Sequence, residues 1–155
     1  MTIQPGTAED LGAIGLLYEE LNARMAALQP DNFRPARQND AWILSQLTEE
    51  NSDFLTARTN EGTVIGFALV QFRDTPDVPS FIPRRYTYLM DLVVTESCRG
   101  QGVGKALLAE VERWARARGS EFIELGVLSE NTAALRVYES CGYTERRKVM
   151  GRSLN

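Results

Sequence analysis

The sequence predicts an α/β fold: a single-domain mixed central β-sheet flanked by helices, spanning residues 1–155. The length of 155 residues suits one domain with a substantial core. Segments with apolar residues at helical spacing are interspersed with short runs rich in β-branched and aromatic residues. No internal repeat, low-complexity tract or linker divides the chain, so a layered sheet-and-helix domain is expected.

The first half of the chain predicts one strand, two helices and a strand pair. Thr7, with Asp10 three residues later, is typical of a helix N-terminus, and apolar residues follow at helical spacing as far as Met25. Asn60-Glu61-Gly62 is a turn sequence between two β-type runs. The expected elements are a strand near Thr2–Gln4, helices over 8–27 and from Trp42 to near Glu50, and strands over Phe54–Thr59 and Thr63–Phe72.

The second half alternates strands and helices after a proline-rich loop over residues 74–84. Gly119 and Gly142 each follow an amphipathic helical pattern, where glycine commonly ends a helix. The expected elements are a strand over Arg85–Thr95, a helix from Val103 to Gly119, a short strand over Phe122–Leu128, a helix over Asn131–Cys141 and a last strand over Tyr143–Arg152.

Composition excludes several kinds of catalytic and metal site. The chain has no histidine, which removes Ser-His-Asp and Cys-His nucleophile systems and the commonest nitrogen ligand of zinc. Cys98 and Cys141 are too few for a four-cysteine zinc site or a disulfide framework, so no metal site is expected. No signal-peptide pattern or bilayer-length apolar run is present. We therefore expect a soluble cytoplasmic protein without a membrane partner.

Charge is distributed unevenly along the chain, whose net charge is −4. Residues 1–80 carry 12 acids and 5 bases, whereas residues 81–155 carry 9 acids and 12 bases. An acidic half and a basic half would suit a cationic substrate and an anionic cofactor, although scattered surface charge gives the same count. The bases are neither dense nor interleaved with aromatic residues, so no nucleic-acid partner is expected.

A glycine-rich loop joins the strand that ends at Val94 to the helix that begins at Val103. Gly100, Gly102 and Gly104 let the backbone approach an anion closely, and the start of a helix supplies unpaired N–H groups. The spacing does not fit the dinucleotide fingerprint, and Ala106 replaces the magnesium-binding hydroxyl of a Walker loop. The loop therefore predicts phosphate binding, with a merely flexible helix entry as the alternative.

Two motifs resemble the signatures of GCN5-related N-acetyltransferases, the GNAT superfamily. Arg99-Gly100-Gln101-Gly102-Val103-Gly104 is similar to the acetyl-CoA signature R/Q-x-x-G-x-G/A. Asn131-Thr132-Ala133-Ala134-Leu135-Arg136-Val137-Tyr138-Glu139-Ser140-Cys141-Gly142-Tyr143 is similar to N-x-x-A-x-x-x-Y-x-x-x-G-[FY]. Both motifs stand in the family's order, and the resemblance extends over nearly the whole chain. It implies a GNAT-like acyl-CoA N-acyltransferase fold.

The resemblance also implies how acetyl-CoA would bind. The strand Leu92–Val94 would pair with the pantetheine arm, and N–H groups of the glycine-rich loop would surround the pyrophosphate. Lys105 and Arg99 would add charge near the phosphates, or else be solvated loop cations; Asn131 would bond the pantetheine arm, cap its helix, or do both. The implied cofactor-binding residues are Leu92, Val93, Val94, Arg99, Gly100, Gln101, Gly102, Val103, Gly104, Lys105, Asn131 and Tyr138.

The same resemblance implies two catalytic residues. Tyr138 would be the general acid that protonates the departing thiolate, unless it is simply a core aromatic on the face of Ala134 and Cys141. Some relatives, such as polyamine acetyltransferases, have Glu-Asp where this chain has Met90-Asp91. The glutamate of those relatives is absent here, which leaves Asp91 as the best single carboxylate for a general base. A structural role for Asp91 stays open, with Tyr88, Glu124 or bulk water as alternative routes for the proton.

The function that follows is acetyl transfer from acetyl-CoA to a primary amine of a small molecule or peptide, by direct attack in a ternary complex. Without a histidine to activate them, Cys98 and Cys141 are expected to be packing or loop residues. A non-catalytic acyl-CoA sensor and a nucleotide-phosphate module are the competing functions. The resemblance implies an acceptor site shaped by residues 22–40 and 74–85, and a homodimer, the common assembly of that family.

Overall fold

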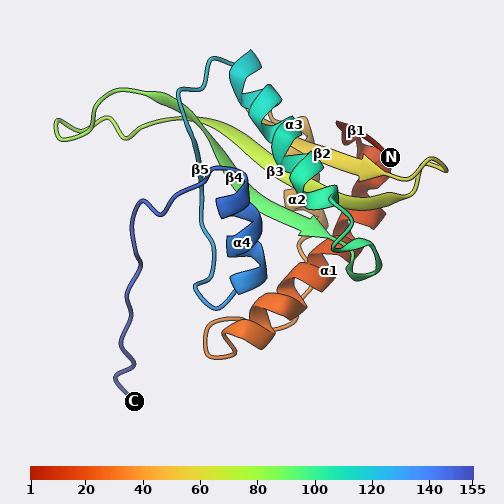
Figure 1. Ribbon diagram of the computed structural model, residues 1–155, viewed down its shortest axis with the longest axis horizontal. Coiled ribbons are helices and arrows are strands. Elements are labelled where there is room, and N and C mark those ends of the chain that lie inside the picture. Colours follow the sequence, from red (N-terminus) through yellow and green to blue (C-terminus); the bar gives the residue numbers. More distant parts are fainter.

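The computed structural model describes residues 1–155 and consists of a 5-stranded sheet with helices on both faces (Figure 1). Neighbouring strands follow chain order and are antiparallel, except that β5 is parallel to β4. The strands are β1 (Thr2–Pro5), β2 (Ser52–Arg58), β3 (Val64–Asp74), β4 (Arg85–Val94) and β5 (Ile123–Leu125). The helices are α1 (Leu11–Leu28), α2 (Asp40–Thr48), α3 (Val103–Ala117) and α4 (Thr132–Ser140), with 3-10 turns at Ala8–Asp10 and Glu96–Cys98.

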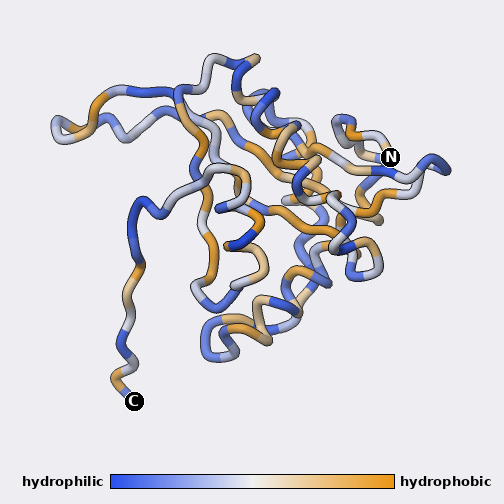
Figure 2. The backbone as a smooth tube through the Cα atoms, in the orientation of Figure 1, coloured by the Kyte–Doolittle hydropathy of each residue, from blue (hydrophilic) through white to orange (hydrophobic).

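The sheet separates two apolar cores. One face packs against α3, whose Leu107 and Val111 are fully buried. The other packs against α1 and α2, where the ring of Tyr18 lies 5.0 Å from that of Phe67. Figure 2 shows hydrophobic residues concentrated along the central strands, whereas hydrophobic and hydrophilic residues alternate along the helices and the C-terminal segment. No helix of the chain combines the length and apolar character that a bilayer crossing needs.

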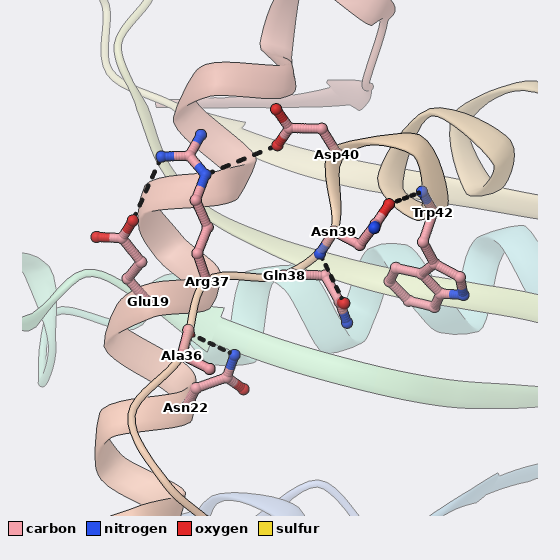
Figure 3. A network of polar contacts seen from close by, with 8 residues as sticks. All are labelled: Glu19, Asn22, Ala36, Arg37, Gln38, Asn39, Asp40 and Trp42. Carbon is pink, nitrogen blue, oxygen red and sulfur yellow. Dashed lines mark hydrogen bonds and ion pairs between the residues drawn. The ribbon is translucent and has the colours of Figure 1, made fainter.

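Polar contacts hold the connection between α1 and α2 against α1 (Figure 3). The Asn22 side chain donates to the carbonyl of Ala36 (2.9 Å), and Arg37 forms an ion pair with Glu19 (3.3 Å). Asn39 caps α2 by accepting a hydrogen bond from the N–H of Trp42 (3.0 Å). These contacts fix how the first two helices sit on the sheet.

A β-bulge interrupts β4 beside the point where β5 ends. Leu69 pairs with Asp91 and Val70 with Leu89, which leaves Met90 unpaired. Leu89 faces the α3 core, and in a regular strand Asp91 would share that face. The bulge reverses the alternation and directs Asp91 toward α1 on the opposite face. Pairing between β4 and β5 covers only Thr87–Leu89, so the two strands separate there; we call this point the β4–β5 fork.

The expected last strand over Tyr143–Arg152 is wrong: no strand follows α4. Tyr143 packs against the α3 core, but the charged run from Glu145 to Lys148 has no alternating apolar face to bury. Val149 is 100% exposed, and Figure 1 shows the C-terminal segment running away from the body of the molecule. β5 is also shorter than expected, because Gly126 and the residues after it have left the edge of β4.

Candidate active site

The glycine loop, which we define as Arg99–Lys105, begins α3 as expected. Gly100 (φ 73°) and Gly102 (φ 85°) have left-handed backbone conformations that favour glycine. Gly102 is the N-cap of α3, and its carbonyl accepts the hydrogen bond of the Ala106 N–H (3.0 Å). The loop therefore turns directly into the helix, with its N–H groups near the positive end of the helix dipole.

Every backbone N–H from Gly100 to Lys105 lacks a hydrogen-bond acceptor within the protein. A Cβ placed on Gly102 or Gly104 would meet no protein atom within 4 Å, so open space lies beside the loop. Lys105 is exposed and forms no ion pair, which leaves its positive charge free. A run of unpaired donors with one free cation is the arrangement that binds phosphate groups.

Glu20 of α1 positions the preceding turn. It accepts hydrogen bonds from the Thr95 hydroxyl (2.7 Å) and the Glu96 N–H (3.0 Å), and its Oε2 lies 3.6 Å from Arg99 Nη2. Arg99 also donates from Nε to the carbonyl of Val94 (2.9 Å). Arg99 thus ties the loop to the end of β4 and to α1, and Lys105 rather than Arg99 is the freely available cation.

The edge of β4 beyond the fork is open. Thr95 donates its N–H to the Ile65 carbonyl of β3. Because the main-chain groups of successive strand residues point to opposite edges, those of Leu92 and Val94 point away from β3. No strand covers that edge after Leu89. The Val94 carbonyl is occupied by Arg99, whereas the N–H and C=O of Leu92 remain available for an extended ligand.

Asp91 lies at the fork and is held by Tyr18. The Tyr18 hydroxyl donates to Asp91 Oδ2 at 2.7 Å, joining α1 to the β4 bulge. Burial raises the pKa of the Asp91 carboxyl above its ordinary value, and the hydrogen bond from Tyr18 opposes part of that rise. The pKa of Tyr18 is itself raised by burial and by the neighbouring Asp91 charge, so Tyr18 remains a hydrogen-bond donor. The arrangement can hold a carboxylate that accepts protons more readily than an exposed aspartate.

Tyr138 of α4 lies on the other side of the fork. Its ring contacts Tyr143 edge-on at 5.8 Å, and its hydroxyl has no hydrogen-bond partner in the protein. That oxygen is not sealed from solvent, because no buried side-chain oxygen is left without a partner. Burial first, then the Tyr143 and Asp91 groups, raises the pKa of Tyr138 to about 12. Asp91 and Tyr138 thus influence each other electrostatically, and the phenol keeps its proton over the physiological range.

Family comparison agrees with this geometry. Residues 16–143 match the model of the Acetyltransferase (GNAT) family, which covers both motifs, the fork and the glycine loop. The chain belongs to the GNAT acetyltransferase family.

Among GNAT relatives, L-ornithine N5-acetyltransferase from Arabidopsis thaliana is 32% identical over 75% of this chain and 49% of its own length. The L-methionine sulfoximine/L-methionine sulfone acetyltransferase of Salmonella typhimurium is 28% identical over 93% of this chain and 80% of its own length. The chain thus spans about half the length of the Arabidopsis relative, and 47% of an uncharacterized N-acetyltransferase from Methanocaldococcus jannaschii.

Solved structures confirm the fold. A mutant of the BH1408 protein from Bacillus halodurans superposes with a TM-score of 0.95 at 24% identity, covering 100% of both chains. An aminoglycoside N-acetyltransferase in complex with CoA superposes with a TM-score of 0.73 at 23% identity, covering 99% of both. The mixed sheet with flanking helices is therefore the GNAT architecture.

The remaining expected residues have other partners. Asn131 caps α4 through the Ala134 N–H (3.2 Å) and also lies 3.4 Å from Arg24 Nη2 of α1. Glu124 forms an ion pair with Arg147 (2.7 Å), so its carboxylate is not free. Cys98 and Cys141 are free thiols.

The hairpin loop over residues 74–84, one of the segments expected to shape the acceptor site, contains a hollow of about 470 Å³. Arg85, at the start of β4, lines this hollow. Asp91 lies six residues further along β4, or about 20 Å at strand spacing. The hollow is therefore remote from Asp91. Residues 22–40, the other segment expected to shape the acceptor site, contact the start of α4.

Two residues of the site were absent from the sequence expectations. Tyr18 follows the apolar positions of α1, and a buried tyrosine needs a partner for its hydroxyl, so its presence there was a usable signal. Glu20 gave no such signal, since a glutamate in a helix is usually solvated. Its role depends on how α1 crosses the end of β4, which the local sequence does not encode.

Proposed function

We propose that the protein transfers the acetyl group of acetyl-CoA to a primary amine of a small molecule or peptide, by direct attack in a ternary complex. The observation that carries this proposal is the run of unpaired N–H groups from Gly100 to Lys105 beside the open edge of β4. The loop suits the pyrophosphate, and the main chain of Leu92 suits the pantetheine arm. Acetyl-CoA supplies the activated thioester; the chain's residues orient it and move protons.

Asp91 is the proposed general base. A primary amine of pKa about 10 is protonated at neutral pH, which opposes the reactive form by about 4 kcal/mol. Asp91 lies at the fork, where β4 and β5 separate, and its raised pKa increases its basicity. It would accept the amine proton directly or through one water, with Tyr18 holding the carboxylate in place.

Tyr138 is the proposed donor to the departing sulfur. Its hydroxyl has no protein partner to give up and lies within electrostatic range of Asp91. A phenol of pKa about 12 is a weaker acid than a thiol of pKa about 8.5, so complete transfer to the thiolate is uphill by about 5 kcal/mol. We therefore propose that Tyr138 first donates a hydrogen bond to the sulfur. It releases its proton to the departing thiolate as the second nitrogen proton, which the amine loses only after it has attacked the thioester, replaces it.

We also propose that the chain forms a homodimer. Its C-terminal segment exposes Met150 (90%) and Leu154 (92%), and the outer edge of β5 is unpaired. Apolar side chains and a free strand edge both favour association with another chain. Light scattering coupled to size-exclusion chromatography should give twice the mass of the chain; a monomer mass at micromolar concentration would contradict the dimer.

Release of CoA with acetyl-CoA and a panel of amines tests the enzymatic proposal. The panel should contain amino acids, polyamines, aminoglycosides and a lysine-containing peptide, and mass spectrometry should identify the acetylated product. Turnover of at least one amine is expected. Tight acetyl-CoA binding without CoA release on any amine would contradict the proposal and favour an acyl-CoA sensor. The observation that favours a sensor is the apolar Met90, which stands at the bulge where some relatives have a glutamate.

A further inference from the structure

Arg73 of β3 differs from the other arginines of the chain. It is half-buried and yet forms no ion pair, whereas Arg58, Arg84 and Arg118, whose side chains are also largely buried, are paired with Asp10, Glu121 and Asp53 respectively. Its Nε and Nη2 both donate to the Gln71 side-chain oxygen, whereas Nη1 has no acceptor in the protein. A partly buried guanidinium with unused donors ordinarily has an anionic partner.

The guanidinium is held in one position. Its carbon lies 4.3 Å from the centre of the Tyr88 ring, a cation–π contact. Gln71, which accepts from Arg73, donates in turn to Gln46 of α2 (2.6 Å), and Gln46 accepts from Ser52 (3.0 Å). This chain of hydrogen bonds fixes the guanidinium before any ligand arrives, so little side-chain entropy is lost on binding.

Arg73 belongs to the same face of the sheet as the candidate base. Gln71 pairs with Tyr88 across β3 and β4, and Leu89 faces the opposite core, so Tyr88 lies on the α1 face. The bulge brings Asp91 onto that same face. Tyr88 and Asp91 are three residues apart, or about 10 Å along β4. A small molecule between the two positions could place an amine at Asp91 and an anionic group at Arg73.

We propose that Arg73 binds the carboxylate of the acceptor, and that the acceptor is therefore an amino acid. This inference rests on the proposed acetyl transfer and narrows it. A planar guanidinium fits a carboxylate through two parallel hydrogen bonds, which discriminates against amines without an acidic group. Polyamines and aminoglycosides, which carry several ammonium groups and no acidic group, would be disfavoured by the charge of Arg73.

Paired substrates test this assignment. CoA release is measured with acetyl-CoA and each proteinogenic amino acid, and with ornithine, against the corresponding carboxamide. Putrescine serves as the decarboxylated partner of ornithine. Rates are compared at equal concentrations of free amine. The wild type should prefer the carboxylate of the best pair by at least about tenfold in kcat/KM, the range of a charged hydrogen bond.

Arg73→Met should lose that preference by raising KM for the amino acid, with little effect on the carboxamide. Arg73→Lys keeps the charge but not the paired donors, so its preference for the carboxylate should lie between those of the wild type and Arg73→Met. Arg84→Met is the matched control, because Arg84 is also half-buried and lies 4.3 Å from the ring centre of Phe122, yet has its own partner in Glu121. Thermal melts confirm that each variant is folded.

Binding separates failure of this inference from failure of the proposed function. N-acetylated amino acids and their amides are titrated calorimetrically into the CoA-loaded protein. If no amine is turned over but the carboxylate ligands bind and Arg73→Met abolishes that binding, the acetyltransfer proposal fails and the carboxylate site stands. Equal binding and turnover of carboxylates and amides, an Arg73→Met defect shared by both, or no binding of any carboxylate would overturn the inference.

Discussion

At the scale of single residues, the account depends on a carboxylate and a phenol at the fork. Asp91 is displaced onto the α1 face by one unpaired residue, Met90, and meets the hydroxyl of Tyr18 there. Tyr138 approaches from α4, and its raised pKa reflects in part the charge of Asp91. The proposed proton acceptor and proton donor therefore come from different elements, and burial is the main cause of the raised pKa of each.

Asp91→Asn should lower kcat/KM by about 10²–10⁴-fold, the contribution of a positioned general base. Asparagine can still accept the hydrogen bond from Tyr18, so the local structure should survive. In the wild type, kcat/KM should decline toward acid with a midpoint above the ordinary aspartate pKa of about 3.9. A variant with wild-type activity and the same acid limb would make Asp91 a structural residue of the bulge.

The stability of the same variant should change with pH in a defined direction. Because the pKa of Asp91 is raised by folding, the native state binds its proton more tightly, and stability falls as pH rises from the unfolded pKa through the folded one. Asparagine has no such ionisation. The free energy of unfolding of Asp91→Asn, relative to wild type, should therefore increase between acid and neutral pH in denaturant titrations; the opposite trend would contradict the assigned direction.

Tyr138→Phe should lower kcat by about 10²–10⁴-fold while leaving the Kd for acetyl-CoA nearly unchanged. The hydroxyl has no protein partner, so its removal should not lower the melting temperature. Tyr143→Phe is the matched control, since Tyr143 is the edge-on neighbour and its pKa is likewise raised to about 12. Near-normal rates for Tyr138→Phe across the pH range would leave water as the proton source.

At the scale of elements, the start of α3 separates ligand binding from folding. Gly104 has no left-handed conformation, and a Cβ there meets no protein atom within 4 Å. Gly104→Val should therefore weaken acetyl-CoA binding by at least about tenfold, because its branches obstruct the approach of the pyrophosphate. It should not lower helix stability, since valine has a higher helix propensity than glycine. Calorimetric titration measures the first effect and a thermal melt the second.

Gly62→Val is the control for backbone strain. Gly62 (φ 89°) lies in the β2–β3 turn, so its substitution should lower the melting temperature without changing acetyl-CoA affinity. Unchanged affinity in Gly104→Val would move the phosphate site away from the glycine loop.

Much of this arrangement was predictable at the element scale, because local sequence encodes it. The glycine-rich loop before Val103 predicted the helix start, and Asn131 predicted a cap that the structure contains. The pairing of Tyr18 with Asp91 and of Glu20 with the turn before the loop could not be predicted, since each joins segments far apart in the chain. The missing C-terminal strand shows the other limit: Tyr143 suggested a strand, but the charged residues after it leave no apolar face to bury.

At the scale of the whole molecule, the two faces of the sheet have different proposed roles. The α3 face and the open edge of β4 provide the glycine loop and the main-chain groups for acetyl-CoA. The α1 face provides Asp91, Tyr18 and Arg73 for the acceptor. The bulge at Met90 lies between them and lets one strand serve both, since Leu92 packs with the α3 core while Asp91 faces α1. An amine reaching Asp91 and a thioester lying along Leu92 would thus meet at the fork.

The melting temperature with and without acetyl-CoA tests this account most directly, because the glycine loop and the open strand edge exist only in the folded chain. A ligand that binds only the native state at about a hundredfold its Kd adds about 2.7 kcal/mol to the free energy of unfolding. For a chain of this length that corresponds to a rise of about 5–10 °C. We expect such a rise for the wild type and at most about half of it for Gly104→Val, because a tenfold weaker Kd leaves about 1.4 kcal/mol at the same acetyl-CoA concentration. A wild-type melting temperature unmoved by millimolar acetyl-CoA would contradict the account.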